Sequence, residues 1–135
     1  MINIEHLAPD TIFDSKPYGF SQIVISRGSR LIHISGQTSN DKDLNIIGEG
    51  DFAAQAKGAF DNVGLAIAAA GAEIGNIVRL NIFVVDYKLE YLDIIGKATT
   101  DFFGELAPPA STMVGVQALA LPPLLIEIEA TAVTD

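Results

Sequence analysis

The segment LLIEIEATAV near the end of the chain sets two carboxylates, Glu127 and Glu129, in an otherwise apolar run. Alternation along a β-strand puts both glutamates on one face and Ile126 and Ile128 on the other. A carboxylate that lines a cleft can act as a general base on water if burial raises its pKa towards neutrality. The spacing is equally typical of a strand with one solvated face, so it leaves both interpretations open.

Ser111 and Thr112 begin the preceding apolar run, after Pro108, Pro109 and Ala110. Their hydroxyls can donate hydrogen bonds to a neutral or weakly polar group of a ligand, and they supply no charge. We therefore treat Ser111 and Thr112 as candidate substrate-binding residues.

Other candidate motifs carry less weight. His33 stands between apolar residues, which favours a core or interface position. Neither His33 nor His6 has a metal-ligating partner at close spacing, so no metal site is predicted.

The run GEGDFA has the G-x-G-x-x-A spacing of dinucleotide-binding loops. However, Asp51 in that run would put a carboxylate where phosphates bind, so we interpret the run as a loop and a helix N-cap.

Composition narrows the class of protein. The 135 residues are 49% hydrophobic and 19% charged, which predicts one globular domain spanning residues 1–135. The net charge of −9 disfavours nucleic acid and anionic membranes as partners. The absence of cysteine excludes disulfides and thiolate chemistry, and no signal peptide is recognisable, so we expect a cytoplasmic protein. A mean hydropathy of +0.35 indicates that some apolar surface is buried between copies of the chain.

These residues need a scaffold, and the hydrophobic periods predict one. Two β-rich runs, 23–26 and 31–35, flank a short turn and are expected to form a hairpin, after an irregular segment at 1–16. Helical periodicity predicts helices at 51–70 and 88–103, and strands are expected at 76–86, 111–119 and 124–133. The order β-β-α-β-α-β-β predicts an α+β fold, a single mixed sheet with two helices packed on one face.

Six segments in sequence order carry a resemblance to a known family: KPYGFSQ, IHISGQTSND, AAQAKGAFDNVGLAIAAAGA, RLNIFVVD, DFFGELAPPAST and IEIEATAV. Together they resemble the RidA/YjgF family over roughly residues 14–133. The resemblance implies a chorismate-mutase-like fold, a homotrimer and ligand clefts between subunits. It also implies hydrolysis of reactive enamines and imines to keto acids and ammonia without a cofactor.

The resemblance also implies roles for particular residues. Tyr18 matches a tyrosine at the cleft, and Gly36 and Gln37 match a motif whose backbone shapes the pocket. Glu127 matches the catalytic glutamate that handles water, whereas Glu129 matches a second glutamate that we interpret as structural.

One position departs from the family pattern. The deaminases have Pro-Ala-Arg-Ser where this chain has Pro109-Ala110-Ser111-Thr112, so Ser111 replaces the arginine that binds the substrate carboxylate. A hydroxyl cannot replace the bidentate fork of a guanidinium. Met113 and Gly96 also differ, standing where the family has a cysteine and an asparagine. Two hypotheses follow: a RidA-like hydrolase or deaminase with altered specificity, or a non-catalytic trimeric module that binds a small molecule.

Overall fold

A four-stranded mixed sheet organises the molecule, and the computed structural model describes all residues 1–135. Its strands are β3 (Arg30–Gln37), β4 (Ile77–Val85), β5 (Ala110–Val116) and β6 (Ile126–Thr134). Their order is β3-β6-β4-β5, and β6 is antiparallel to both of its neighbours, whereas β5 is parallel to β4. The expected α+β class is confirmed, with the strands close to their expected positions.

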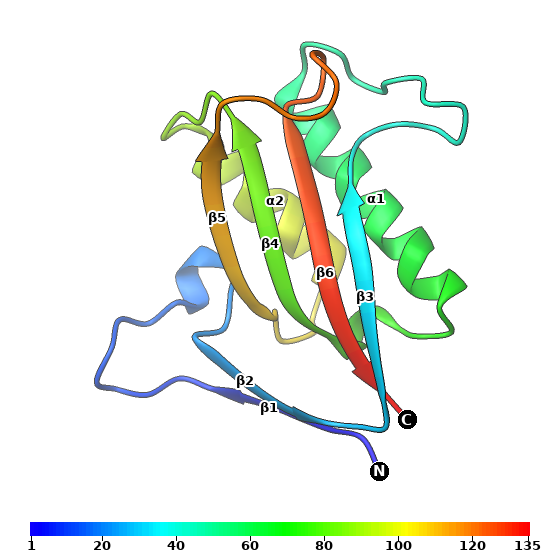
Figure 1. Cartoon of the computed structure of the whole chain (residues 1–135). Helices are drawn as coiled ribbons and strands as arrows, with labels where there is room; N and C mark the ends of the chain where they lie inside the picture. Colours follow the sequence, from blue (N-terminus) through cyan, green and yellow to red (C-terminus); the bar gives the residue numbers. More distant parts are fainter.

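Both helices lie on the same side of this sheet, and the opposite face carries no helix (Figure 1). Helix α1 (Phe52–Ala69) begins where the sequence predicts, since the Asp51 carboxylate accepts a hydrogen bond from the Ala54 amide at 3.1 Å. Gly71 follows its end with φ of +74°, a conformation that favours glycine. The second helix is α2 (Tyr91–Phe103). Neither helix combines the length and the apolar character that a membrane span requires.

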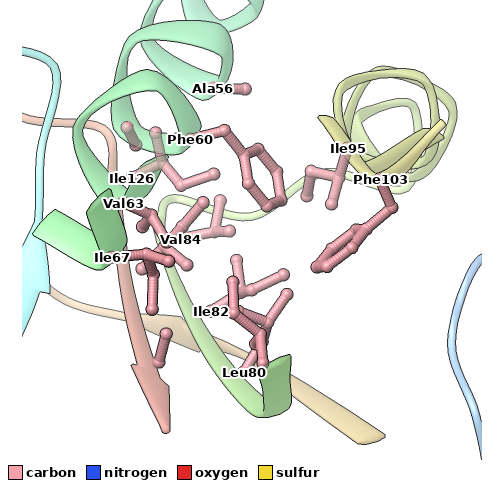
Figure 2. Close-up of a cluster of buried hydrophobic side chains, with 14 of the residues drawn as sticks. Ala56, Phe60, Val63, Ile67, Leu80, Ile82, Val84, Ile95, Phe103 and Ile126 are labelled. Atoms are coloured by element: carbon pink, nitrogen blue, oxygen red, sulfur yellow. The ribbon is translucent and has the colours of Figure 1, made fainter. Parts of the chain in front are cut away.

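The core fills the layer between the helices and the sheet (Figure 2). Phe60 and Val63 of α1 point towards Ile82 and Val84 of β4, and Ile95 of α2 closes the cluster from the side. Along β6, Ile126, Ile128, Ala130 and Ala132 are buried in this layer, while Glu127, Glu129 and Thr131 alternate with them on the open face. The predicted separation of the two faces of this strand is therefore correct.

The predicted hairpin and single sheet are wrong. Strand β2 (Ile23–Arg27) pairs with β1 (Asn3–Leu7), which lies in the segment expected to be irregular, and the two form a separate two-stranded sheet. At Gly28 the chain passes so close to β6 that an added Cβ would lie 2.5 Å from the Thr134 carbonyl oxygen. The chain bends there, so β2 leaves the plane of the main sheet, and its hydrogen-bonding groups are satisfied by β1.

His33 is exposed on the open face opposite Thr131 of β6, so it is not a core residue of the single chain, and the expected interface position stays a prediction. Gln55 of α1 is completely buried although it is polar. Its side chain donates to the Pro123 carbonyl at 2.9 Å and accepts from the Leu125 amide at 2.9 Å, which fixes the chain at the entry to β6.

Candidate functional site

The predicted site residues divide between the two faces of the sheet. In the register of β4 and β5, Ser111 lies beside Leu80, a core residue, and Thr112 lies beside Asn81. Ser111 therefore faces the helix layer and Thr112 faces the open side. The two hydroxyls that sequence reasoning grouped together point in opposite directions, because neighbouring residues of a strand alternate.

A cavity of about 500 Å³ lies beside α2 and β5 on the helix side. Tyr18 and Ser111 both line it, so the structure brings together these two predicted site residues. Its floor is apolar and comes from the core, whereas Gly96 of α2 leaves part of the wall without a side chain. No other heavy atom lies within 4 Å of the place where a Gly96 Cβ would stand.

Three aromatic rings form the wall that faces the floor of this cavity, Phe13, Tyr18 and Phe20. The Phe13 ring meets the Tyr18 and Phe20 rings edge to face, with centroids 6.1 Å and 6.2 Å apart. Sequence reasoning named Tyr18 alone. The signal that could have found the others is the spacing of three aromatics within a short loop that also contains Pro17 and Gly19.

Internal hydrogen bonds fix the conformation of this aromatic loop. The buried Ser15 hydroxyl donates to the Phe20 carbonyl at 2.6 Å, and the Gln22 side chain donates to the Phe13 carbonyl at 3.0 Å. A 3-10 turn, Lys16–Tyr18, ends at Gly19 with φ of +81°, which a side chain would strain. The wall is therefore built before any ligand arrives.

The loop is also attached to the start of β5. Ser21 donates its hydroxyl to the Pro108 carbonyl and its amide to the Pro109 carbonyl, the latter at 3.0 Å. The ring of His6 lies 3.0 Å from the same hydroxyl. Because the hydroxyl hydrogen goes to Pro108, the His6 Nδ1 is the donor in this contact. These bonds tie the aromatic wall to the residues just before Ser111.

The cavity lining contains no charged side chain. The Thr99 hydroxyl donates to the Ile95 carbonyl at 2.7 Å within α2, so it is already paired. By contrast, the hydroxyls of Tyr18 and Ser111 make no hydrogen bond with any other group of the chain. These two hydroxyls are therefore the side-chain groups free to bind a polar atom of a ligand.

Glu127 lies on the other face, packed against Gly36. A Cβ added to Gly36 would stand 2.6 Å from the Glu127 carboxyl carbon and 2.7 Å from its Cγ. A side chain at this position would therefore force the half-buried Glu127 side chain to move. Gln37 follows at a register shift of β3, and its side-chain amide donates to the Ser35 carbonyl at 3.1 Å. The structure thus brings Gly36 against Glu127, whereas Gln37 pairs with Ile128, whose side chain is buried on the helix side.

Neighbouring polar residues on the open face are already paired. The Asn81 amide donates to Glu129 at 2.9 Å, which supports a structural role for that glutamate. The Arg79 guanidinium donates to the Thr112 hydroxyl at 2.8 Å. Within one chain Arg79 lies on the face opposite the cavity, so it does not supply the cation missing at Ser111 of the same chain, and Thr112 does not line the cavity.

The α+β fold thus carries a half-buried glutamate on one face of its sheet and an aromatic cavity on the other. Residues 14–134 match the model of the family described as Endoribonuclease L-PSP, which is the RidA/YjgF family. The chain therefore belongs to this family, as its motifs predicted.

Individual relatives support this family assignment. The protein DfrA of Myxococcus xanthus is 31% identical over 117 residues, covering 85% of this chain and 85% of that protein. The human protein named 2-iminobutanoate/2-iminopropanoate deaminase is 30% identical, covering 84% of this chain and 79% of its own length.

Solved structures separate into two degrees of similarity. A Rid family protein of Yersinia pestis, YyfB, described as of unknown function, has a TM-score of 0.94 and 37% identity, covering 97% of this chain and 98% of its own. Rv2704 of Mycobacterium tuberculosis covers 98% of this chain and 99% of its own at 28% identity, yet its TM-score is 0.63.

The contact between Gly36 and Glu127 gives a first prediction. Gly36→Ala forces the glutamate out of its rotamer, which should destabilise the protein by about 1 kcal/mol. In the Glu127→Ala background the same substitution meets no carboxylate, so most of that loss should disappear. Urea unfolding of the four proteins of this double-mutant cycle measures the coupling, and purely additive effects would contradict the packing described.

Proposed function

We propose that this protein is a RidA-like, cofactor-free hydrolase or deaminase that acts on a small imine, enamine or related amine. In this proposal the chain assembles as a homotrimer, and each active site lies in a cleft between subunits. Glu127 of one subunit activates water, and Ser111 and Tyr18 of the next subunit orient the substrate. Gly36 and Gln37 shape the wall beside the glutamate.

The observation that carries the proposal is the division of the site between two faces. Glu127 lies on the open face of the sheet, while Ser111 and Tyr18 line a cavity on the helix side, next to the edge strand β5. One chain cannot bring these groups to a single substrate, because the sheet separates them. A second copy whose open face meets this edge would supply the missing half of the site.

The reaction needs only water and one proton carrier. Glu127 takes one proton from water as the oxygen adds to the imine carbon and returns that proton to the nitrogen, which gives a neutral carbinolamine. Glu127 then takes the hydroxyl proton and passes it to the nitrogen as the carbon–nitrogen bond breaks, so the oxygen becomes a carbonyl and ammonia leaves. Every atom comes from the imine and one water molecule, and the glutamate ends as it began.

The substrate should differ from that of the human relative, whose name specifies 2-iminobutanoate and 2-iminopropanoate. Both compounds carry a carboxylate, and the cavity around Ser111 has no cation to pair with it. Loss of one partner of a buried charged pair weakens binding by about 2–5 kcal/mol. That corresponds to roughly thirty- to several-thousand-fold in affinity for a 2-imino acid.

A second candidate function is a trimeric module that binds a small molecule without turning it over. The uncharged cavity favours this alternative, since a glutamate opposite two hydroxyls can hold an amine as readily as activate water. A ligand that stabilises the protein strongly and is recovered unchanged would support this function.

Glu127→Gln should abolish ammonia release from the best substrate in a panel of imines, enamines and related amines. The amide cannot accept the proton of water, so the rate should fall by about 100-fold or more. Glu129→Gln is the matched control, since that position is paired with Asn81 and should keep most of the activity. Equal background rates for the wild type and both variants would leave the binding module as the better account.

A shared site also predicts complementation between inactive variants. Ser111→Phe should block the cavity, and Glu127→Gln removes the base, so each homotrimer should be inactive. Random assembly of equal amounts after co-refolding joins two intact halves at about a quarter of the clefts, which should restore that fraction of the wild-type rate. No recovery in mixtures shown by mass spectrometry to contain mixed trimers would exclude a cleft shared between subunits.

Ser111→Arg should restore recognition of carboxylates. The guanidinium would enter a cavity that has room for it, so hydrolysis of 2-iminobutanoate should rise by about tenfold or more. Ser111→Met, of similar length and without charge, serves as the control. If arginine gives no gain, more than one residue separates this chain from the 2-imino acid deaminases, and Met113 and Gly96 are the next positions to change.

A further inference from the structure

Resting on the proposed function, we infer the substrate class that the cavity beside α2 selects. We propose that it binds a planar apolar group, such as an aromatic ring, that carries an uncharged polar atom in place of a carboxylate. Phe13 and Phe20 are then specificity-determining residues, and neither belongs to the residues expected from the family resemblance.

The shape of the lining supports a flat apolar group. Three aromatic rings face a floor that includes Ile82, Ile95 and Met113. The Phe13 ring meets its two aromatic neighbours edge to face, so a further ring entering the cavity can adopt the same favoured geometry. Phe13 is 62% exposed and Tyr18 65% exposed in the single chain, so both have apolar surface that a ligand can cover.

The size of the cavity supports a group larger than the side chain of a short imino acid. Its volume of about 500 Å³ falls within the range of about 300–1,000 Å³ typical of sites for organic ligands. Gly96 enlarges it, because nothing lies within 4 Å of the place that its Cβ would occupy. A substrate with only a methyl or ethyl side chain would leave much of this apolar surface in contact with water.

The wall needs little reorganisation to bind such a group. The loop that carries Phe13 and Phe20 is held by hydrogen bonds from Gln22 and Ser15 to the carbonyls of these same two residues. Preorganisation of this kind lowers the entropy lost on binding. The aromatic wall is therefore a built feature of the chain before a ligand arrives.

The polar groups of the lining determine whether a charged or a neutral ligand is bound. The free hydroxyls of Tyr18 and Ser111 can each donate to or accept from a neutral atom, and no side chain of the lining carries a charge. An anion bound against this lining would lose hydration without gaining a counter-charge from the same chain, which is strongly unfavourable. A neutral group of similar shape, such as a carboxamide or an imine, loses far less hydration free energy. The cavity should therefore bind neutral ligands more tightly than anions.

Three stable probes test this selectivity without any turnover: phenylacetamide, phenylacetate and acetamide. Binding is measured by NMR shifts of the Met113 and Ile82 methyl groups at the cavity floor. Phenylacetamide should bind at least about tenfold more tightly than either of the other two, because only it combines a ring with a neutral polar group. Equal affinity for phenylacetate, or shifts confined to methyl groups elsewhere, would overturn the inference.

Two variants test whether the aromatic wall itself holds the ring of the probe. Phe13→Ala should lower the affinity for phenylacetamide by about tenfold. Leu89 is an exposed apolar residue outside the cavity, so Leu89→Ala should leave this affinity unchanged. If Phe13→Ala alters the sedimentation coefficient but not phenylacetamide binding, the aromatic cluster is a subunit contact and the inference fails.

The wild-type titration, compared with the ammonia-release assay on the same protein, distinguishes this inference from the proposed function, because binding of the three probes requires no turnover. Selective binding in a protein that shows no turnover would refute the hydrolase and keep the inference, whereas turnover without the predicted selectivity would do the reverse.

Discussion

The period of two along β4, β5 and β6 is the constraint on which the rest of the structure depends. Apolar residues of these strands must face the two helices to bury a core, and this fixes the side to which every intervening residue points. Glu127 is on the open face because Ile126 and Ile128 are completely buried. Ser111 is on the helix side because its neighbour in the register, Leu80, is buried there. Core packing thus sets the geometry of the candidate site.

Much of the fold was predictable because its signals are local and repeated. The N-cap at Asp51, the helical period of α1 and the alternation in β6 each follow from short-range rules, and the structure agrees with all three. The pairing of β2 was not predictable in the same way. A short turn between two β-rich runs favours a hairpin, and the bend at Gly28 depends on the approach of β6, which is distant in the chain.

The candidate site was likewise predictable only where local signals define it. The motif around Glu127 indicated a carboxylate with a special environment, but its contact with Gly36 joins two strands that are distant in sequence. Strand alternation alone separates Ser111 from Thr112, once their strand is placed. The contributions of Phe13 and Phe20 could not be read from periodicity, since they come from an irregular loop whose position depends on hydrogen bonds to Ser15, Gln22 and the start of β5.

The bend at Gly28 divides the chain into parts with different evolutionary freedom. Everything before it, including β1, β2 and the aromatic loop, forms a flap outside the main sheet, while the glutamate and its glycine partner belong to the sheet itself. In the proposed site, substitutions in the aromatic loop would alter the wall of the cavity and leave the contact between Gly36 and Glu127 unchanged, because the two features lie on opposite sides of this bend in the chain.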